Sequence, residues 1–437
     1  MPIAHLKDNY GALLKSKTMR SLSMLLSANI LNGVIGFITS VLVLRYVDKE
    51  VIGVIYPLIS ILMILGQFGD LGLSNSFIKI SSIHFSSNRF TSYQFFNAAF
   101  KLKSFLCILI LIICIPLSSV MAQWTFGEKV YVYWVRWIIV ISCLQIMSSY
   151  ASSALQVEGK FLPLSSTKII PTLLKMLMIG IVVRLGVANL QWMFWAFALV
   201  PIITFLLTFS YTAKDPIYKI NSTPKQLSEL FHVSKWVALS ALANAFIGQL
   251  DILMTRSIAG IDELNKYLGG QKLASVFPIL TVSLVTVLLP KVSSMKNKKE
   301  LNYFLRKSVK IIFPLAFLML ALLPLSTYVI PFILGAKYKS SIDIFNILMI
   351  GEIISLTVTP MSLILYNLNK EPMFALLNII QLVFNLVGNY LFIRTNGAVG
   401  AAWVTALAKL IAVALVYYHL WKEGIINHHE EENENII

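Results

Sequence analysis

GQFGDLGLSNSFIKI, residues 66–80, is apolar at both ends and carries a carboxylate, Asp70, between two aliphatic stretches. If the surrounding residues span a membrane, a charged side chain facing lipid at this position would cost about 3 kcal/mol or more. We therefore expect Asp70 to face the interior of a helical bundle. Whether the flanking residues do span a membrane depends on the composition of the rest of the chain.

That composition is typical of a polytopic membrane protein. Hydrophobic residues make up 57% of the chain and charged residues 13%, with a mean hydropathy of +0.77, which excludes a soluble protein of 437 residues. A helix needs about 20 apolar residues to cross the hydrocarbon layer, and the apolar runs here are long enough. They do not alternate as the strands of a membrane barrel do. The sequence predicts an all-α polytopic membrane protein.

The apolar runs predict twelve spans in two lobes of six. The longest polar connection contains Pro216 and Pro224, which break helices, and it divides the chain. The predicted spans are 20–45, 53–82, 97–121, 131–157, 161–185, 190–213, 233–258, 264–290, 304–331, 342–368, 372–394 and 397–421. The predicted domains are an N-terminal lobe (1–213), a cytoplasmic loop (214–232), a C-terminal lobe (233–422) and a disordered acidic tail (423–437).

Lysines and arginines set the predicted orientation. Cations are retained on the cytoplasmic side of membrane-flanking loops. With the N-terminus inside, the inner group, which includes Lys101 and Lys103, is about twice as large as the outer group, which includes Arg184, Arg256 and Arg394. We therefore predict that both termini face the cytoplasm.

Several classes of function are excluded. The net charge of +16 is spread over membrane-flanking loops, which argues against a nucleic-acid partner. The sequence has no P-loop, HExxH or GxSxG motif, so it predicts neither an enzyme nor a cofactor. A metal site is not expected either, because a solvated tail explains His428 and His429 better than a metal site does. The cysteines, Cys107, Cys114 and Cys143, all lie in predicted spans.

Five charged residues lie deep in predicted spans. Three are acidic, Asp70, Asp251 and Glu352, and two are basic, Lys175 and Lys409. Two interpretations are open: structural ion pairs or snorkelling lysines, or a polar pathway through the bundle. As a set they favour a pathway, in which the carboxylates are candidates for proton or ion coupling.

The two halves resemble each other at an offset of about 210 residues. KIIPTLLKMLMIGIVVRLGVA, from Lys168, aligns with NIIQLVFNLVGNYLFIRTNGA, from Asn378, and pairs Arg184 with Arg394. Two like lobes in the same orientation are typical of transporters with parallel repeats, which bind substrate between the lobes.

A family resemblance rests on three segments in chain order. They are LRYVDKEVIGVIYPLISILMILGQFGDLGLSNSFIKI (44–80), VLLPKVSSM (287–295) and FNLVGNYLFIRTNGAVGAAWVTAL (384–407). Together they resemble the Wzx-type polysaccharide-biosynthesis flippases of the multidrug/oligosaccharidyl-lipid/polysaccharide exporter (MOP) superfamily. The resemblance covers nearly the whole chain.

The resemblance implies a MATE-like fold and translocation of undecaprenyl-pyrophosphate-linked oligosaccharide across the bacterial inner membrane, for O-antigen or capsule synthesis. It implies membrane lipid as a further partner and allows contact with other membrane proteins of polysaccharide assembly. A cationic lumen is described for the family. The candidates here are Arg45, which lies in a quoted segment, and four residues chosen from position alone, Lys175, Arg256, Lys272 and Lys409.

Three alternatives remain. A multidrug or metabolite antiporter would share the fold but would favour an acidic pocket, and drug susceptibility of intact cells would discriminate it. A lipid II flippase is expected to have more spans. A membrane-embedded glycan polymerase or ligase would need large outer loops with catalytic Arg or His, which protease mapping would detect.

Overall fold

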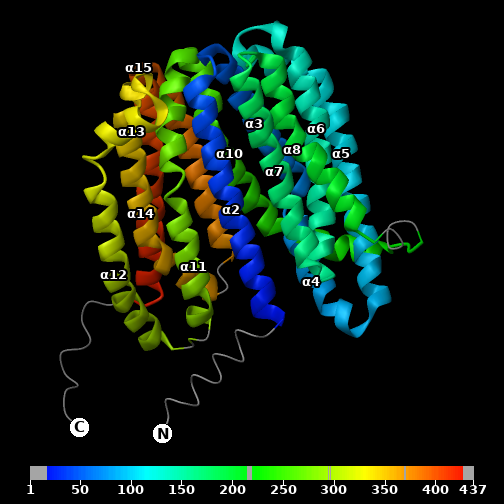
Figure 1. The fold of residues 1–437 in the computed structure, drawn as a ribbon. Coiled ribbons are helices and arrows are strands. Elements are labelled where there is room, and N and C mark those ends of the chain that lie inside the picture. Colours follow the sequence, from blue (N-terminus) through cyan, green and yellow to red (C-terminus); the bar gives the residue numbers. More distant parts are fainter. Residues whose placement is uncertain (1–16, 214–218, 294, 296, 369–370, 427–437) are drawn as a thin grey trace, which may run out of the picture. The chain divides into compact units, whose positions relative to one another are not determined.

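The computed structural model describes residues 17–213, 219–293, 295, 297–368 and 371–426, and these residues are largely helical, with no strand among them (Figure 1). Within these ranges, nine helices are long and apolar enough to cross a membrane. The count rises to ten if α12 (Lys298–Ala321) and α13 (Ser326–Leu334), bent by 69°, form one crossing. The predicted class, an all-α membrane protein, is confirmed. The predicted loop at 214–218 and the predicted tail from residue 427 lie outside the described residues.

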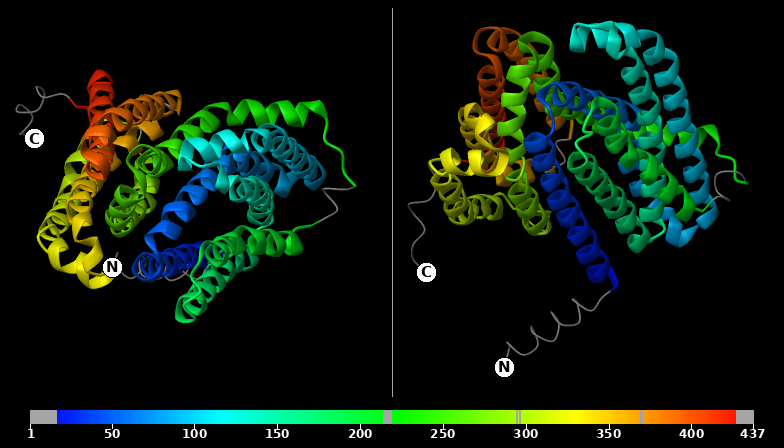
Figure 2. Two further views of the ribbon diagram at one scale, coloured as in Figure 1. Left: turned by 90° about the horizontal axis from the view of Figure 1, so that it is seen from above. Right: turned by 45° about the horizontal axis from the view of Figure 1, so that its top comes forward.

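The chain forms two compact units, Met1–Ala245 and Phe246–Ile437. Within the first unit, α2 packs on α7, α5 on α6, and α8 on both α6 and α7. Figure 2 shows α5 and α6, in cyan, side by side from two further directions. The helices of this unit are α2 (Lys17–Tyr46), α3 (Lys49–Asp70), α4 (Leu73–Ser87), α5 (Arg89–Phe126), α6 (Val132–Val157), α7 (Phe161–Arg184) and α8 (Leu190–Tyr211), with a 3-10 turn η1 (Lys129–Tyr131).

The core of the first unit joins α4, α5 and α6 through aromatic and small side chains. Phe77 of α4 meets Phe96 of α5 edge to face, with ring centroids 4.9 Å apart, and stacks on Tyr150 of α6. Ala98 and Ala151 are fully buried beside these rings. Small residues let the helix backbones approach closely, which is how helices pack in lipid. This packing holds α5 against the break between α3 and α4.

That break lies inside the span predicted at 53–82. Helix α3 ends at Asp70 and α4 starts at Leu73, because Leu71 and Gly72 both take left-handed backbone conformations, with φ of 44° and 67°. Left-handed φ is strained for a leucine and costs a non-glycine residue about 1–2 kcal/mol. The GDLG sequence thus divides one predicted span into two helices.

The second unit contains α11 (Pro278–Ser293), α12, α13, a 3-10 turn η2 (Ala336–Ser341), α14 (Ile342–Asn367) and α15 (Glu371–Lys422). It also contains the end of α10 (Pro224–Ala274), whose first residues belong to the first unit. Helices α14 and α15 pack together, and Figure 2 shows them side by side. The apolar core joins α11, α12, α14 and α15 through residues such as Leu288, Phe304, Ile364 and Leu420.

Two of these helices reverse direction at a glycine. Backbone angles are non-helical at Gly260 of α10 (φ 86°) and at Gly397 of α15 (φ 57°). Asp251 and Tyr267 lie 16 residues apart on α10 and would be about 24 Å apart along a straight helix, yet their side chains are joined by a 2.6 Å hydrogen bond. The chain therefore folds back on itself, and the amide of Gln381 likewise reaches the carbonyl of Ala408 at 2.9 Å across the reversal of α15.

Helix α10 begins inside the segment assigned to the connecting loop. Thr223 precedes Pro224, the first helical residue, and both the backbone N–H and the hydroxyl of Thr223 donate to the side-chain oxygen of Gln226. Threonine followed three residues later by glutamine is a capping-box pattern, and proline is well suited to the first helical position. The Thr223–Gln226 cap and the proline at the first position therefore explain why the helix starts at residue 224.

Candidate functional site

Asp70 forms a buried ion pair in the first unit. The ammonium group of Lys103, on α5, lies 2.6 Å from the Oδ1 of Asp70. It also donates to Ser74 of α4 at 2.8 Å and to Ser149 of α6 at 2.6 Å, so three acceptors meet its three donor hydrogens. Lys103 is 1% exposed, and the side chain of Asp70 is 18% exposed. Four helices thus meet at one charged cluster.

The helix break places Asp70 in this cluster. Aspartate side chains often cap a break in a helix by accepting from a nearby backbone N–H. Instead, Asp70 accepts from the hydroxyl of Ser74 and from Lys103, and the N-cap residue of α4, Gly72, makes no side-chain cap. On either side of the break, Asp70 at the end of α3 and Ser74 in the first turn of α4 both contact the ammonium of Lys103 on α5.

Lys103 is the residue that sequence reasoning missed. In the predicted orientation, Lys103 belongs to the cytoplasmic cations near the start of the span predicted at 97–121, whereas α5 starts at Arg89 and carries Lys103 well inside the helix. The signal was present in the sequence. Asn88 caps the helix by accepting from the N–H of Thr91, and asparagine is a preferred N-cap residue.

In the second unit, the carboxylate of Asp251 accepts hydrogen bonds from three uncharged side chains. Its carboxylate accepts from the hydroxyl of Tyr267 at 2.6 Å, from the hydroxyl of Thr405 at 2.6 Å and from the amide of Asn389 at 2.7 Å. The residue is 4% exposed. The donors come from both arms of α15 and from the far arm of α10, so this carboxylate joins the two helix hairpins.

Lys409 and Glu352 form the second buried ion pair. The ammonium of Lys409, on α15, lies 2.6 Å from the Oε1 of Glu352, on α14, and their side chains are 23% and 18% exposed. Lys409 follows Thr405 by one helical turn, so this pair and the Asp251 network lie on the same face of α15. The structure therefore brings three of the predicted charged residues together in the second unit.

The other predicted cations have different surroundings. Arg45 is exposed at the end of α2, with its guanidinium 5.7 Å from the ring centre of Tyr46. Lys175 is half-buried on α7, and its ammonium lies 5.2 Å from the ring centre of Phe197 on α8. Arg256 is 9% exposed and Lys272 is half-buried, both on α10. Lys175 thus differs from Lys103 and Lys409, because its described partner is an aromatic ring rather than a carboxylate.

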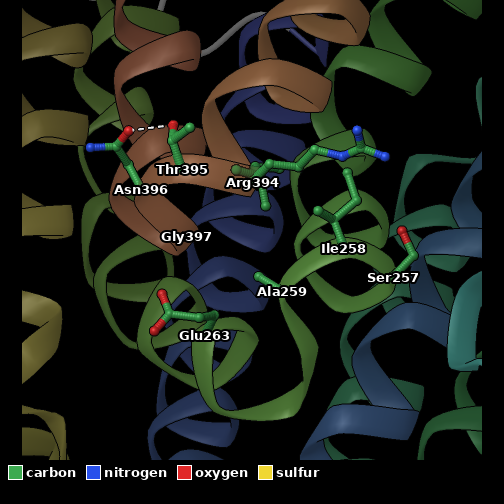
Figure 3. Close-up of a pocket in the computed structure, with 9 residues that line it drawn as sticks. Ser257, Ile258, Ala259, Glu263, Arg394, Thr395, Asn396 and Gly397 are labelled. Atoms are coloured by element: carbon green, nitrogen blue, oxygen red, sulfur yellow. Dashed lines mark hydrogen bonds between the residues drawn. The ribbon is translucent and has the colours of Figure 1, made fainter.

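A polar cavity of about 700 Å³ lies where α10 and α15 reverse, within the second unit. Figure 3 shows Arg394 extending on the side of Ser257, Asn396 and Thr395 on the other side, and Glu263 below Gly397. The Oε2 of Glu263 accepts from the backbone N–H of Ala398 at 2.8 Å, which joins the two reversals directly.

A metal ion has no evident site in the parts of the chain that the structure describes, where no group of three or more His, Cys, Asp or Glu comes together. The buried charges are instead matched by lysines, hydroxyls and amides. Buried charges with hydrogen-bonded partners inside a membrane bundle are typical of pathways for polar substrates and of structural networks. The geometry alone supports both interpretations.

Comparison with known proteins gives the family. The polysaccharide biosynthesis protein family matches residues 18–296. A Shigella flexneri protein named for O-antigen transport is 24% identical over 221 residues, which cover 50% of this chain and 53% of the relative. The chain thus spans about half the length of the curated relatives that it matches.

Solved structures agree on the fold. An inward-facing multidrug resistance MATE transporter of the MOP superfamily superposes with a TM-score of 0.73 at 14% identity, covering 90% of this chain and 94% of that one. The lipid II flippase MurJ in an inward closed conformation gives a TM-score of 0.72 at 16% identity, covering 91% and 87%. Such low identities establish the fold alone. The resemblance noted in the sequence is confirmed, and the chain belongs to the polysaccharide biosynthesis protein family.

Proposed function

We propose that this chain is a flippase that translocates undecaprenyl-pyrophosphate-linked oligosaccharide repeat units across the bacterial inner membrane, by alternating access, for O-antigen or capsule synthesis. The observation that carries the proposal is the family match over residues 18–296. The Shigella relative, named for O-antigen transport, supports the same class of substrate. In this proposal the chain transports its substrate and carries out no chemical step on it.

The proposed architecture has twelve spans, two six-helix lobes and cytoplasmic termini. Among the described residues, nine helices are long and apolar enough to span a membrane, but two of them, 238–285 and 373–422, contain the reversals at Gly260 and Gly397. Each reversing helix supplies two crossings, and the bent pair of α12 and α13 supplies one more. An even number of crossings returns the C-terminus to the side of the N-terminus.

The physical problem for such a carrier is the polar head of the substrate. Each polar group that loses water without a replacement costs about 2–7 kcal/mol, so a pyrophosphate with several sugars needs a wet, charged passage. The proposed lumen cations are Arg45, Lys175, Arg256, Lys272 and Lys409, and the proposed coupling carboxylates are Asp70, Asp251 and Glu352. Lys175 is the first choice for contact with phosphate, because substrate does not have to displace a carboxylate from it.

The membrane potential is a plausible driving force. A pyrophosphate diester carries two negative charges, and moving each outward is favoured by about 2.3 kcal/mol per 100 mV if it crosses the whole field. If the potential drives export, the empty carrier must return to its inward-facing state without moving much of its own charge back through the membrane field. Carboxylates that bind protons, or that are neutralised by a neighbouring lysine as Asp70 and Glu352 are, meet this requirement.

Deletion of the gene tests the function. We expect lipid-linked oligosaccharide to accumulate on the cytoplasmic leaflet and surface polysaccharide to be lost, and the wild-type chain to restore both. A chain with Lys175→Ala, Lys409→Gln and Glu352→Gln should fold but fail to restore surface polysaccharide. The Glu352→Gln change avoids leaving a buried carboxylate without its partner. Normal polysaccharide in the deletion strain would contradict the proposed function, and full restoration by the triple variant would remove these residues from it.

An antiporter of small molecules, a class that the superposed multidrug transporter shows can be built on this fold, is the second candidate. It predicts increased drug susceptibility in the deletion strain with unchanged surface polysaccharide. The mixed charge of the buried clusters, with a lysine beside two of the three carboxylates, argues against a pocket built for cationic drugs.

A further inference from the structure

The polar cavity between the two reversals of the second unit has the features of a binding site for an uncharged, hydroxyl-rich ligand. It measures about 700 Å³, within the range of about 300–1,000 Å³ that small-molecule sites occupy. Its polar lining combines Arg394, Asn396, Thr395 and Ser257 with the carboxylate of Glu263. None of these residues belongs to the buried charged clusters described above.

The mixture of donors and acceptors indicates the class of ligand. Arginine offers only donors, a carboxylate only acceptors, and asparagine, serine and threonine both. Sugar hydroxyls also donate and accept, so a saccharide can use every one of these groups. The ionised pyrophosphate diester of the proposed substrate can only accept, so it cannot use the Glu263 carboxylate, which would also repel it within the same cavity.

The polar groups are already held in place. Glu263 is fixed by the N–H of Ala398 and by Lys266 at 2.5 Å. The hydroxyl of Thr395 donates to the side-chain oxygen of Asn396 at 2.6 Å, which leaves the amide N–H groups of Asn396 able to donate elsewhere. The guanidinium of Arg394 lies over the ring of Tyr390, 4.0 Å from its centre. Groups fixed before binding lose little entropy when a ligand arrives.

The position of the cavity fits the end of a transport cycle. Arg256, before the first reversal, and Arg394, at the second, both belong to the cations predicted on the outer side of the membrane. We propose that this cavity binds the sugar portion of the lipid-linked oligosaccharide on the outer side, after the head has crossed. This inference rests on the proposed function and adds to it a sugar site separate from the cations proposed for the pyrophosphate.

Binding to the purified full-length chain in nanodiscs tests the site. The first probe is the oligosaccharide released by mild acid from the lipid-linked intermediates of the deletion strain, and the second is inorganic pyrophosphate. We expect the oligosaccharide to bind, and Arg394→Gln and Asn396→Ala each to weaken its binding about tenfold or more. Pyrophosphate in excess should not displace it. Both residues are exposed, so the variants should fold, which their unfolding temperatures will check.

Arg184→Gln is the matched control. Arg184 aligns with Arg394 in the sequence repeat and is also exposed, but it lies on α7 and does not line this cavity. We expect its oligosaccharide affinity to stay within about twofold of wild type. Equal affinities in wild type, Arg394→Gln and Asn396→Ala would overturn the sugar site, as would displacement of the oligosaccharide by pyrophosphate.

Complementation separates this inference from the proposed function. If the wild-type chain restores surface polysaccharide and the cavity variants bind and restore as well as wild type does, only the sugar site is wrong. If the wild-type chain does not relieve the accumulation of lipid-linked oligosaccharide, the proposed function fails and the sugar site fails with it. Reduced restoration by Arg394→Gln and Asn396→Ala, with full restoration by Arg184→Gln, supports both.

Discussion

At the scale of single residues, the main feature is that each of the three carboxylates predicted within spans has specific partners. Asp70 has Lys103, Glu352 has Lys409, and Asp251 has three neutral donors. A buried ion pair is weak evidence for stability, because desolvation offsets most of the attraction, but losing one partner is costly. The same residues are therefore hard to remove singly, whether their role is transport or structure.

Removing Lys103 should destabilise the first unit. Lys103→Met leaves the Asp70 carboxylate buried without its cation, and we expect a loss of about 3–5 kcal/mol, seen as a lower unfolding temperature in detergent. Asp70→Asn combined with Lys103→Met removes both charges and should recover more than half of that loss. Lys101→Met is the control, since Lys101 is exposed two residues away on α5. Equal stability of Lys103→Met and Lys101→Met would show that the pair has no structural role.

At the scale of elements, glycines decide where the long helices turn. Gly397 has a left-handed φ of 57°, and a Cβ atom there would collide with the carboxylate of Glu263. Gly36, in α2, has open space around it and lies within a helix. Two glycines in predicted spans thus have opposite roles, one required by a reversal and one tolerant of a side chain.

Gly397→Ala and Gly36→Ala test this difference. We expect Gly397→Ala to destabilise the protein by about 1–3 kcal/mol, because it adds backbone strain and a clash. Gly36→Ala should be neutral or stabilising by up to about 1 kcal/mol, because alanine is the better helix former. Unfolding temperatures of the two purified variants provide the measurement. If Gly36→Ala lost as much stability as Gly397→Ala, the reversal of α15 would not depend on its glycine.

At the scale of the whole molecule, the proposed twelve-span topology places both reversals on the outer side. In a chain whose three cysteines are replaced by alanine, a cysteine at Asp262 or Thr395 should react with a membrane-impermeant maleimide in intact spheroplasts. Both residues are exposed beside the reversals. A cysteine at Arg89, which is exposed where α4 meets α5, should react only after the membrane is opened. Labelling of Asp262→Cys and Thr395→Cys from opposite sides would contradict the topology.

The class of the protein, and which of its residues need explanation, follow from the order of amino acids alone. Long, non-alternating apolar runs require a helical membrane protein, because in lipid the backbone groups find partners only within a helix or between the strands of a closed barrel, whose strands alternate. The sequence also identified Asp70, Asp251, Glu352, Lys175 and Lys409 as charges within apolar runs. A charged residue within a long apolar run can be recognised from the sequence whatever the tertiary fold is.

The partners of these charges depend on how the helices fold together. Lys103 is counted among the cytoplasmic cations near the start of the span predicted at 97–121, and no periodicity in the sequence pairs it with Asp70, 33 residues earlier, across a helix break. The hydrogen bond from Thr405 to Asp251 joins residues 154 positions apart in the sequence. The cavity is lined by the reversals of α10 and α15, which lie at two glycines far apart in the sequence. Hydropathy reports how each residue is solvated, whereas partners depend on how helices turn and pack, which the order of residues along one helix does not contain.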